Sequence, residues 1–167
     1  MSSANFTHVK INHGRYGRTT MPLPDPLNPG NPFAGSSGFT HLDGKRKWSE
    51  IWAALPAPLV GDPSLSAIDF DQWPEEYLQV AGRRGRLTAE VRRAEGGRFR
   101  QYVLGRAVGD RDEARAPAPT EEIEWSDHVA LVFPHEVWTS ATVTPVFRHW
   151  FETGELPADL TLRELDL

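Results

Sequence analysis

The chain has 167 residues, a length that fits one domain with a single hydrophobic core, and 39% of its residues are hydrophobic. It contains no cysteine, which excludes disulfides, thiolate zinc sites, iron–sulfur clusters and cysteine nucleophiles. The net charge of −5 argues against general nucleic-acid binding, because affinity for phosphate depends on an excess of clustered Lys and Arg.

The N-terminal part lacks the apolar core of a secretory signal, and no apolar run in the chain is long enough to cross a membrane. We therefore expect a cytoplasmic protein with no membrane partner. Between Thr19 and Gly38 the chain is rich in proline and glycine, so neither a helix nor a central strand can continue through it. Such a strap could dock on the surface through Met21, Leu23, Leu27 and Phe33. We accordingly expect an arm or strap over residues 1–42 and a single α+β domain over residues 43–167.

The next segment has apolar residues at helical spacing. The positions i, i+3, i+4 and i+7 are occupied by Trp48, Ile51, Trp52 and Leu55. With Asp43 as a start signal and Pro56 as a stop, this spacing predicts a short amphipathic helix. Residues 65–70 then have a strand pattern.

Asp69 and Asp71 would share one face of that strand, where paired carboxylates could hold a cation or move a proton. Asp is also a natural turn former, and Asp71 stands directly before the strand-breaking segment 72–75. We favour the turn.

Three short apolar alternations follow between residues 76 and 106, separated by turns that contain glycine. Turns this short join antiparallel strands, because a parallel return needs a crossover of about a dozen residues or more. This region therefore predicts an antiparallel meander. Residues 123–133 alternate in the same way and predict two more strands.

The C-terminal segment predicts a helix over residues 139–154, with Gly154 as its stop and Pro145 leaving its exact start open. Leu160 and Leu162 alternate as in a closing strand. His149 lies at the flank of the apolar stripe, so we expect a structural or surface histidine. The predicted fold class is α+β: a single antiparallel sheet, a meander of about five to six strands, with an N-terminal-side helix and a C-terminal-side helix packed on it.

Catalytic and metal-binding patterns are absent from the sequence. The six histidines include no i, i+4 pair and no His-x-His, so we predict no metal site. The segment 34–38 resembles a Gly-x-Ser-x-Gly elbow only loosely and has no preceding strand pattern. No phosphate-binding glycine motif is present. We therefore predict neither catalytic residues nor a cofactor.

Charge is distributed unevenly along the chain. Eight arginines gather in and near the meander: Arg83, Arg84, Arg86, Arg92, Arg93, Arg98, Arg100 and Arg106. Acidic residues and one tryptophan follow, and they form the predicted partner-binding surface: Asp110, Asp112, Glu113, Glu121, Glu122, Glu124, Trp125 and Asp127. One interpretation is an ordinary solvated sheet face and loop. The other is a recognition surface, since complementary charge speeds encounter and an aromatic side chain can anchor a complex.

The last third of the chain resembles the polymorphic-toxin immunity proteins, in particular the family paired with deaminase toxins. The positions that carry the resemblance are Glu136, Phe147, Thr153, Gly154 and Pro157, and residues 77–93 resemble the earlier hairpin of that family. It extends over about residues 48–165. The resemblance implies a sheet with flanking helices and non-catalytic neutralisation of a cognate toxin.

Three functional hypotheses follow. The leading one is a cytoplasmic immunity-type protein that neutralises a cognate protein toxin by occluding it, the toxin being a basic, nucleic-acid-directed enzyme. A second is a small biosynthetic enzyme or small-molecule-binding protein with His135 or His149 as acid or base. Its aromatic pocket between sheet and helix would be lined by Trp48, Trp52, Trp138 and Trp150. A third is a nucleic-acid binder that uses the arginine-rich meander.

Overall fold

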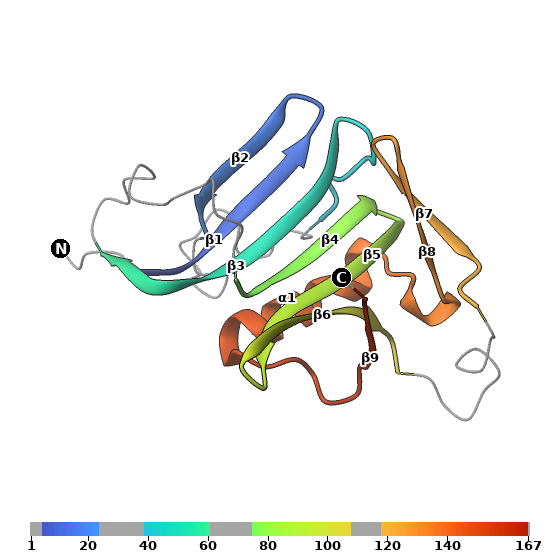
Figure 1. Cartoon of the computed structure of the whole chain (residues 1–167). Helices are drawn as coiled ribbons and strands as arrows, with labels where there is room; N and C mark the ends of the chain where they lie inside the picture. Colours follow the sequence, from blue (N-terminus) through green and yellow to red (C-terminus); the bar gives the residue numbers. More distant parts are fainter. Residues whose placement is uncertain (1–4, 24–38, 61–74, 108–117, 167) are drawn as a thin grey trace.

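The computed structural model describes residues 5–23, 39–60, 75–107 and 118–166. A seven-stranded antiparallel sheet dominates it (Figure 1). Its strands lie in the order β2 (Gly17–Pro22), β1 (Asn5–Gly14), β3 (Lys47–Val60), β4 (Tyr77–Arg83), β5 (Arg86–Glu95), β6 (Arg98–Gly105) and β9 (Thr161–Glu164). A separate two-stranded sheet consists of β7 (Glu121–Trp125) and β8 (His128–Val132).

One helix, α1 (Ser140–Thr153), packs on one face of the large sheet, behind the strands in Figure 1. The Oγ1 of Thr139 caps its start by accepting a hydrogen bond from the backbone N–H of Thr142 at 3.2 Å. Gly154 ends it with φ +76, a conformation that suits glycine, and its N–H donates to the carbonyl of Trp150. Pro145 lies inside the helix rather than at its start. His149 is exposed, as expected for a surface position.

The main core lies between α1 and the sheet. Its members alternate along the strands and recur at helical spacing on α1: Trp52, Leu78, Val80, Leu87, Ala89, Val91, Leu104, Trp138, Val143, Val146, Phe147 and Trp150, joined by Leu23, Phe39 and Leu42. The opposite face of the sheet carries a second cluster around Val9, Ile11 and Ile51. Strands β3 to β5 therefore bury side chains on both faces.

The helix expected over residues 48–55 is wrong, because this segment is part of β3. Ile51 and Ala53 are buried on one face of the sheet, and Trp52 is buried on the other. A strand buried on both faces shows no clean alternation, so its apolar residues can also fit helical spacing. Asp43 does not start a helix. Its Oδ1 instead accepts backbone N–H groups of residues 45, 46 and 47, and so holds the turn into β3.

The antiparallel meander is confirmed in β4, β5 and β6, and the C-terminal helix and closing strand are confirmed in α1 and β9. The fold is α+β in this coarser sense, with seven strands in the large sheet instead of five to six. The described residues contain one α-helix instead of two, besides the short 3-10 helix η3 (Pro134–Glu136). The two strands near residues 123–133 form their own sheet.

Part of the segment expected as an arm contributes to the sheet. Strands β1 and β2 form one edge, and Leu23, just after β2, is buried in the main core. The rest of the expected strap, residues 24–38, lies outside the described residues. So does the strand expected at residues 65–70, with Asp69 and Asp71. In the part of the chain that the structure describes, no helix combines the length and apolarity needed to span a membrane.

Candidate protein-binding surface

The predicted acidic surface falls on the β7–β8 hairpin. Glu121, Glu122, Glu124 and Trp125 belong to β7, and Asp127 is in the turn. The three other predicted members, Asp110, Asp112 and Glu113, lie outside the described residues. The structure therefore brings five of the eight predicted residues together on one element.

A two-residue turn joins the strands of this hairpin. Its first residue, Ser126, has φ +54, which is typical of the tight turns whose twist matches paired strands. Because side chains alternate along a strand, Ile123 faces the large sheet while Glu122 and Glu124 face outward. Ile123 is fully buried and packs with Val103 and Val132. This contact fixes which side of the hairpin faces solvent.

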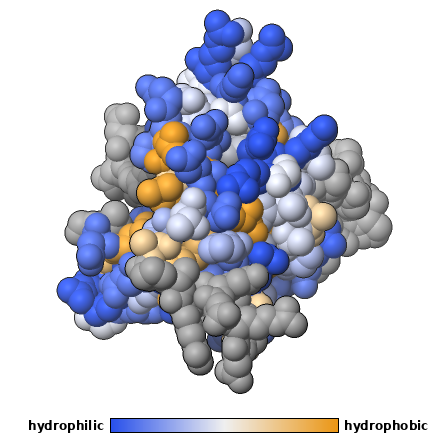
Figure 2. All heavy atoms as spheres, turned by 90° about the vertical axis from the view of Figure 1, so that its right-hand side faces the viewer, coloured by the Kyte–Doolittle hydropathy of each residue, from blue (hydrophilic) through white to orange (hydrophobic). Residues whose placement is uncertain are grey.

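The outward side of the hairpin combines acidic and apolar side chains. Val129 is 49% exposed and Leu131 is 52% exposed. In the strand register Glu124 lies opposite Val129, and Glu122 lies opposite Leu131. We call these four residues the outer face of the hairpin. Figure 2 shows this side of the molecule, where hydrophobic areas lie among hydrophilic ones.

Sequence reasoning missed the apolar half of the outer face. The signal was present, since pairing the two predicted strands across a two-residue turn places Val129 and Leu131 beside the glutamates. It was instead Trp125 that we expected to anchor a partner. Trp125 is half-buried on the inward side, in contact with the third hydrophobic cluster and with the His128 ring at 4.7 Å between centroids. Its position favours a structural role.

The acidic hairpin and the arginine-rich meander are neighbours in space, and part of their charge pairs internally. The Nη2 of Arg86 lies 2.7 Å from the Oε2 of Glu121, and its Nε donates to the carbonyl of Glu122 at 2.8 Å. A hollow of about 360 Å³ beside this contact mixes both signs, with Lys45 and Arg83 opposite Glu122 and Glu124. Glu121 is thus less available to a partner than Glu122 and Glu124.

The arginines do not form one basic face. Arg92 and Arg93 are adjacent on β5 and therefore point to opposite faces of the sheet. Arg93 pairs with Glu95 at 2.6 Å, and Arg100 pairs with Glu164 at 3.2 Å. These ion pairs reduce the net positive charge that a phosphate backbone would meet.

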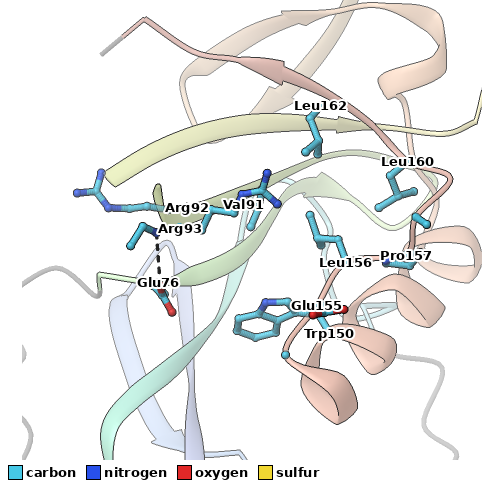
Figure 3. A pocket seen from close by; sticks show the side chains of 13 residues that line it. Glu76, Val91, Arg92, Arg93, Trp150, Glu155, Leu156, Pro157, Leu160 and Leu162 are labelled. Carbon is cyan, nitrogen blue, oxygen red and sulfur yellow. Dashed lines mark hydrogen bonds between the residues drawn. The ribbon is translucent and has the colours of Figure 1, made fainter. Parts of the chain in front are cut away.

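The aromatic pocket lined by four tryptophans is not found among the described residues. Trp52, Trp138 and Trp150 are buried in the main core, and Trp48 stacks on the His13 ring. A cavity of about 550 Å³ does lie nearby, between the C-terminal end of α1 and β5 (Figure 3). Of the four, only Trp150 lines it.

Apolar side chains from three elements gather around this cavity, with charged groups at its rim (Figure 3). Leu156 and Leu160 come from the segment after α1, Leu162 from β9 and Val91 from β5. At the rim, Arg93 is held by its ion pair with Glu95 and lies over the Tyr102 ring at 5.1 Å. The histidines proposed as acid or base do not line the cavity.

Glu136 and Glu50 are nearly inaccessible, and each has partners that explain its burial. Glu136 binds the guanidinium of Arg163 through both of its oxygens, with contacts from 2.9 to 3.2 Å, and accepts the backbone N–H of Phe133. Glu50 accepts the indole N–H of Trp52 at 2.7 Å and lies 3.2 Å from the Nε2 of His41. These contacts favour structural roles for both carboxylates.

Glu90 is a largely buried carboxyl on the sheet face that the hairpin covers. Burial raises the pKa of Glu90 above its ordinary value. Three groups act in the opposite direction: a 2.5 Å hydrogen bond from Gln101, and the nearby charges of Arg163 and His128. Across residues 5–23, 39–60, 75–107 and 118–166, no group of three or more His, Asp or Glu residues is placed to hold a metal ion.

Comparison of the chain with protein-family models, curated proteins and solved structures gives no match. The resemblance to immunity proteins therefore stays a prediction. A function has to be argued from the surfaces of this chain itself.

Proposed function

We propose that this protein binds a basic partner protein through the outer face of the β7–β8 hairpin. The observation that carries the proposal is the pairing of two exposed apolar side chains, Val129 and Leu131, with two outward carboxylates, Glu124 and Glu122. Desolvated apolar residues supply much of the affinity of protein complexes, and surrounding charges select the partner and speed its approach. The hairpin presents both on one element.

The immunity-type resemblance supplies a partner class for this surface. A toxin that acts on nucleic acid carries positive charge, because it must bind phosphate. An acidic outer face is complementary to such a protein and could occlude it without any chemistry. Cytoplasmic neutralisation of a cognate toxin is thus the specific form of our proposal.

Co-expression with the product of the adjacent open reading frame tests this function. We expect the two proteins to co-purify and the adjacent product to be less toxic in the presence of this chain. The double variant Val129→Ser/Leu131→Ser should lose the complex. Phe99→Ser is the matched control, since Phe99 is 40% exposed on β6, away from the hairpin. Absence of a complex, or equal loss with Phe99→Ser, would contradict the proposal.

A second candidate function rests on the cavity beside α1. Its volume of about 550 Å³ lies within the range of roughly 300 to 1,000 Å³ found for small-molecule sites. Arg92 and Arg93 line the cavity together with Glu76 and Glu155, and we assign the headgroup of a small amphipathic acid to the two arginines. Decanoate should then raise the melting temperature, and decyltrimethylammonium should not. Equal shifts, or none with either compound, would remove this candidate.

A further inference from the structure

One main-chain edge of strand β8 has no pairing strand in the described part of the chain. There, β8 pairs with β7 alone. In a hairpin with a two-residue turn, the pair flanking the turn exchanges both hydrogen bonds, and bonded and non-bonded pairs then alternate. Trp125 and His128 flank the turn. The main-chain N–H and C=O groups of Val129 and Leu131 therefore point away from β7.

These groups have no partner in the part of the chain that the structure describes. Within the described ranges, no hydrogen bond reaches the main chain of Val129 or Leu131 on this edge. The equivalent edge of β7 is different, because the side chain of Arg86 donates to the carbonyl of Glu122 at 2.8 Å. Strand β7 also packs against β4 and β5. Of the two hairpin edges, β8 is the one available for pairing.

Composition leaves the β8 edge unprotected. Proteins usually block exposed edges with charged side chains, proline or a very short strand. The outer strand β9 follows this rule, with four residues that include Arg163 and Glu164. Strand β8 reads His-Val-Ala-Leu-Val and contains neither Lys nor Pro. Its two residues with free main-chain groups are also the ones whose side chains are about half exposed.

We propose that β8 accepts an extended segment of the partner protein as an added antiparallel strand, hydrogen-bonded to Val129 and Leu131. This proposal rests on the proposed function, since it assigns a binding mode to the outer face. Alternate side chains of the added strand lie beside Val129 and Leu131, so they are apolar. Strands are spaced about 4.8 Å apart, which places the added chain roughly 10 Å from β7. Lys or Arg in that chain then reaches Glu122 and Glu124.

A second copy of this chain is a poorer occupant of the edge. Pairing of two β8 strands would bring no positive charge toward Glu122 and Glu124, because β8 contains neither Lys nor Arg. A basic segment from another protein gains attraction to both glutamates. The charge of the outer face therefore selects a foreign strand over self-association.

A peptide series tests the main-chain pairing directly. The parent is a blocked Arg-Thr-Val-Thr-Val-Thr-Arg, whose two valines can lie beside Val129 and Leu131. Two derivatives carry N-methyl groups on either the threonines or the Val and Arg residues. Alternate N–H groups of an added strand face β8 and the others face solvent. We expect one methylated derivative to bind like the parent and the other to bind at least about tenfold more weakly, the loss expected for a broken set of main-chain bonds. Equal affinity of the two derivatives would overturn strand addition.

Amide hydrogen exchange locates the paired strand. In the free protein, the N–H groups of Val129 and Leu131 should exchange quickly, while those of Ala130 and Val132 are protected by β7. Binding of the parent peptide should slow Val129 and Leu131 by about tenfold or more. Binding without this change would place the peptide elsewhere. Protection of the same two amides without peptide, with a dimer in sedimentation, would show self-association and overturn the proposal.

A proline variant completes the test. Leu131→Pro removes the outward N–H without removing an N–H that bonds to β7, and should abolish peptide binding. Leu131→Thr keeps the N–H and should weaken binding only a few-fold. If Leu131→Pro does not fold, the methylated peptides alone test the main-chain pairing with β8. If Val129→Ser/Leu131→Ser loses the partner but the peptide and exchange assays show no strand pairing, the proposed function stands. Only strand addition as its binding mode is then overturned.

Discussion

Gly82 occupies a backbone position that a larger residue cannot take without strain. Its φ is +121, and a Cβ built on it would lie 2.5 Å from the main-chain oxygen of Arg86 and 3.1 Å from the Cγ2 of Ile123. Because the nearest atom is backbone, no side-chain rotation relieves the clash. Gly82→Ala should lower the free energy of unfolding by about 2 kcal/mol or more, measured by chemical denaturation.

Gly85 offers a matched control three residues away. A Cβ there meets nothing within 4 Å, and its φ is not positive. Gly85→Ala should therefore change the free energy of unfolding by less than about 0.5 kcal/mol. Similar effects of the two substitutions would show that the close approach of Gly82 to β5 is not what limits stability.

Glu90 makes stability depend on pH in a predictable direction. Burial raises the pKa of the folded-state carboxyl, so the folded state binds more protons than the unfolded state. The stabilisation from this group is complete below the unfolded pKa of about 4.3 and is lost as pH rises through the higher folded value. Glu90→Gln cannot ionise, so its stability does not fall in this way as pH rises. Its side-chain oxygen can still accept the hydrogen bond from Gln101.

The stability of Glu90→Gln relative to the natural chain should therefore increase between about pH 4 and pH 7, as followed by denaturation at several pH values. Glu155→Gln is the control, because Glu155 is exposed on the segment after α1. A constant difference across this range for Glu90→Gln would show that burial does not govern its protonation.

At the scale of elements, α1 depends on its first turn. Thr139 and Thr142 cap each other, since each side chain accepts the backbone N–H of the other residue at 2.9 to 3.2 Å. Thr139→Ala should cost about 1 kcal/mol of stability, whereas Thr139→Ser keeps the capping oxygen and should cost much less. Thermal unfolding measures both variants. An equal loss in the two would assign the effect to the methyl group rather than to the cap.

Sequence patterns predicted the elements best where local signals suffice. Glycine turns defined the β4–β5–β6 meander, and Gly154 marked the end of α1. Sequence patterns failed for residues 48–55, because burial on both faces of β3 depends on α1 and on β1, which are distant in sequence. Part of the candidate site follows from the sequence. Glu122 and Glu124 are among the predicted acidic residues and are exposed on β7, but the Arg86–Glu121 pair and the exposure of Val129 and Leu131 follow from how the hairpin docks.

At the scale of the whole molecule, the large sheet forms the core and the small sheet forms the outer face of the hairpin. The seven-stranded sheet and α1 enclose the main core, and the β7–β8 hairpin rests on the sheet through Ile123, Val103 and Val132. The hairpin thereby turns its glutamates and two apolar residues toward solvent. Its anchoring by Arg86 pairs the charge of Glu121 and leaves Glu122 and Glu124 as exposed carboxylates of the outer face.

Association kinetics with the partner test this account most directly. Glu122→Lys/Glu124→Lys should slow association by about tenfold at low salt, and the difference should fade at high salt as the charges are screened. Glu152→Lys/Glu155→Lys makes the same change in net charge at the far end of α1, and should leave the rate close to that of the natural chain. Equal slowing by the two double variants, or no slowing by the first, would contradict binding through the outer face of the hairpin.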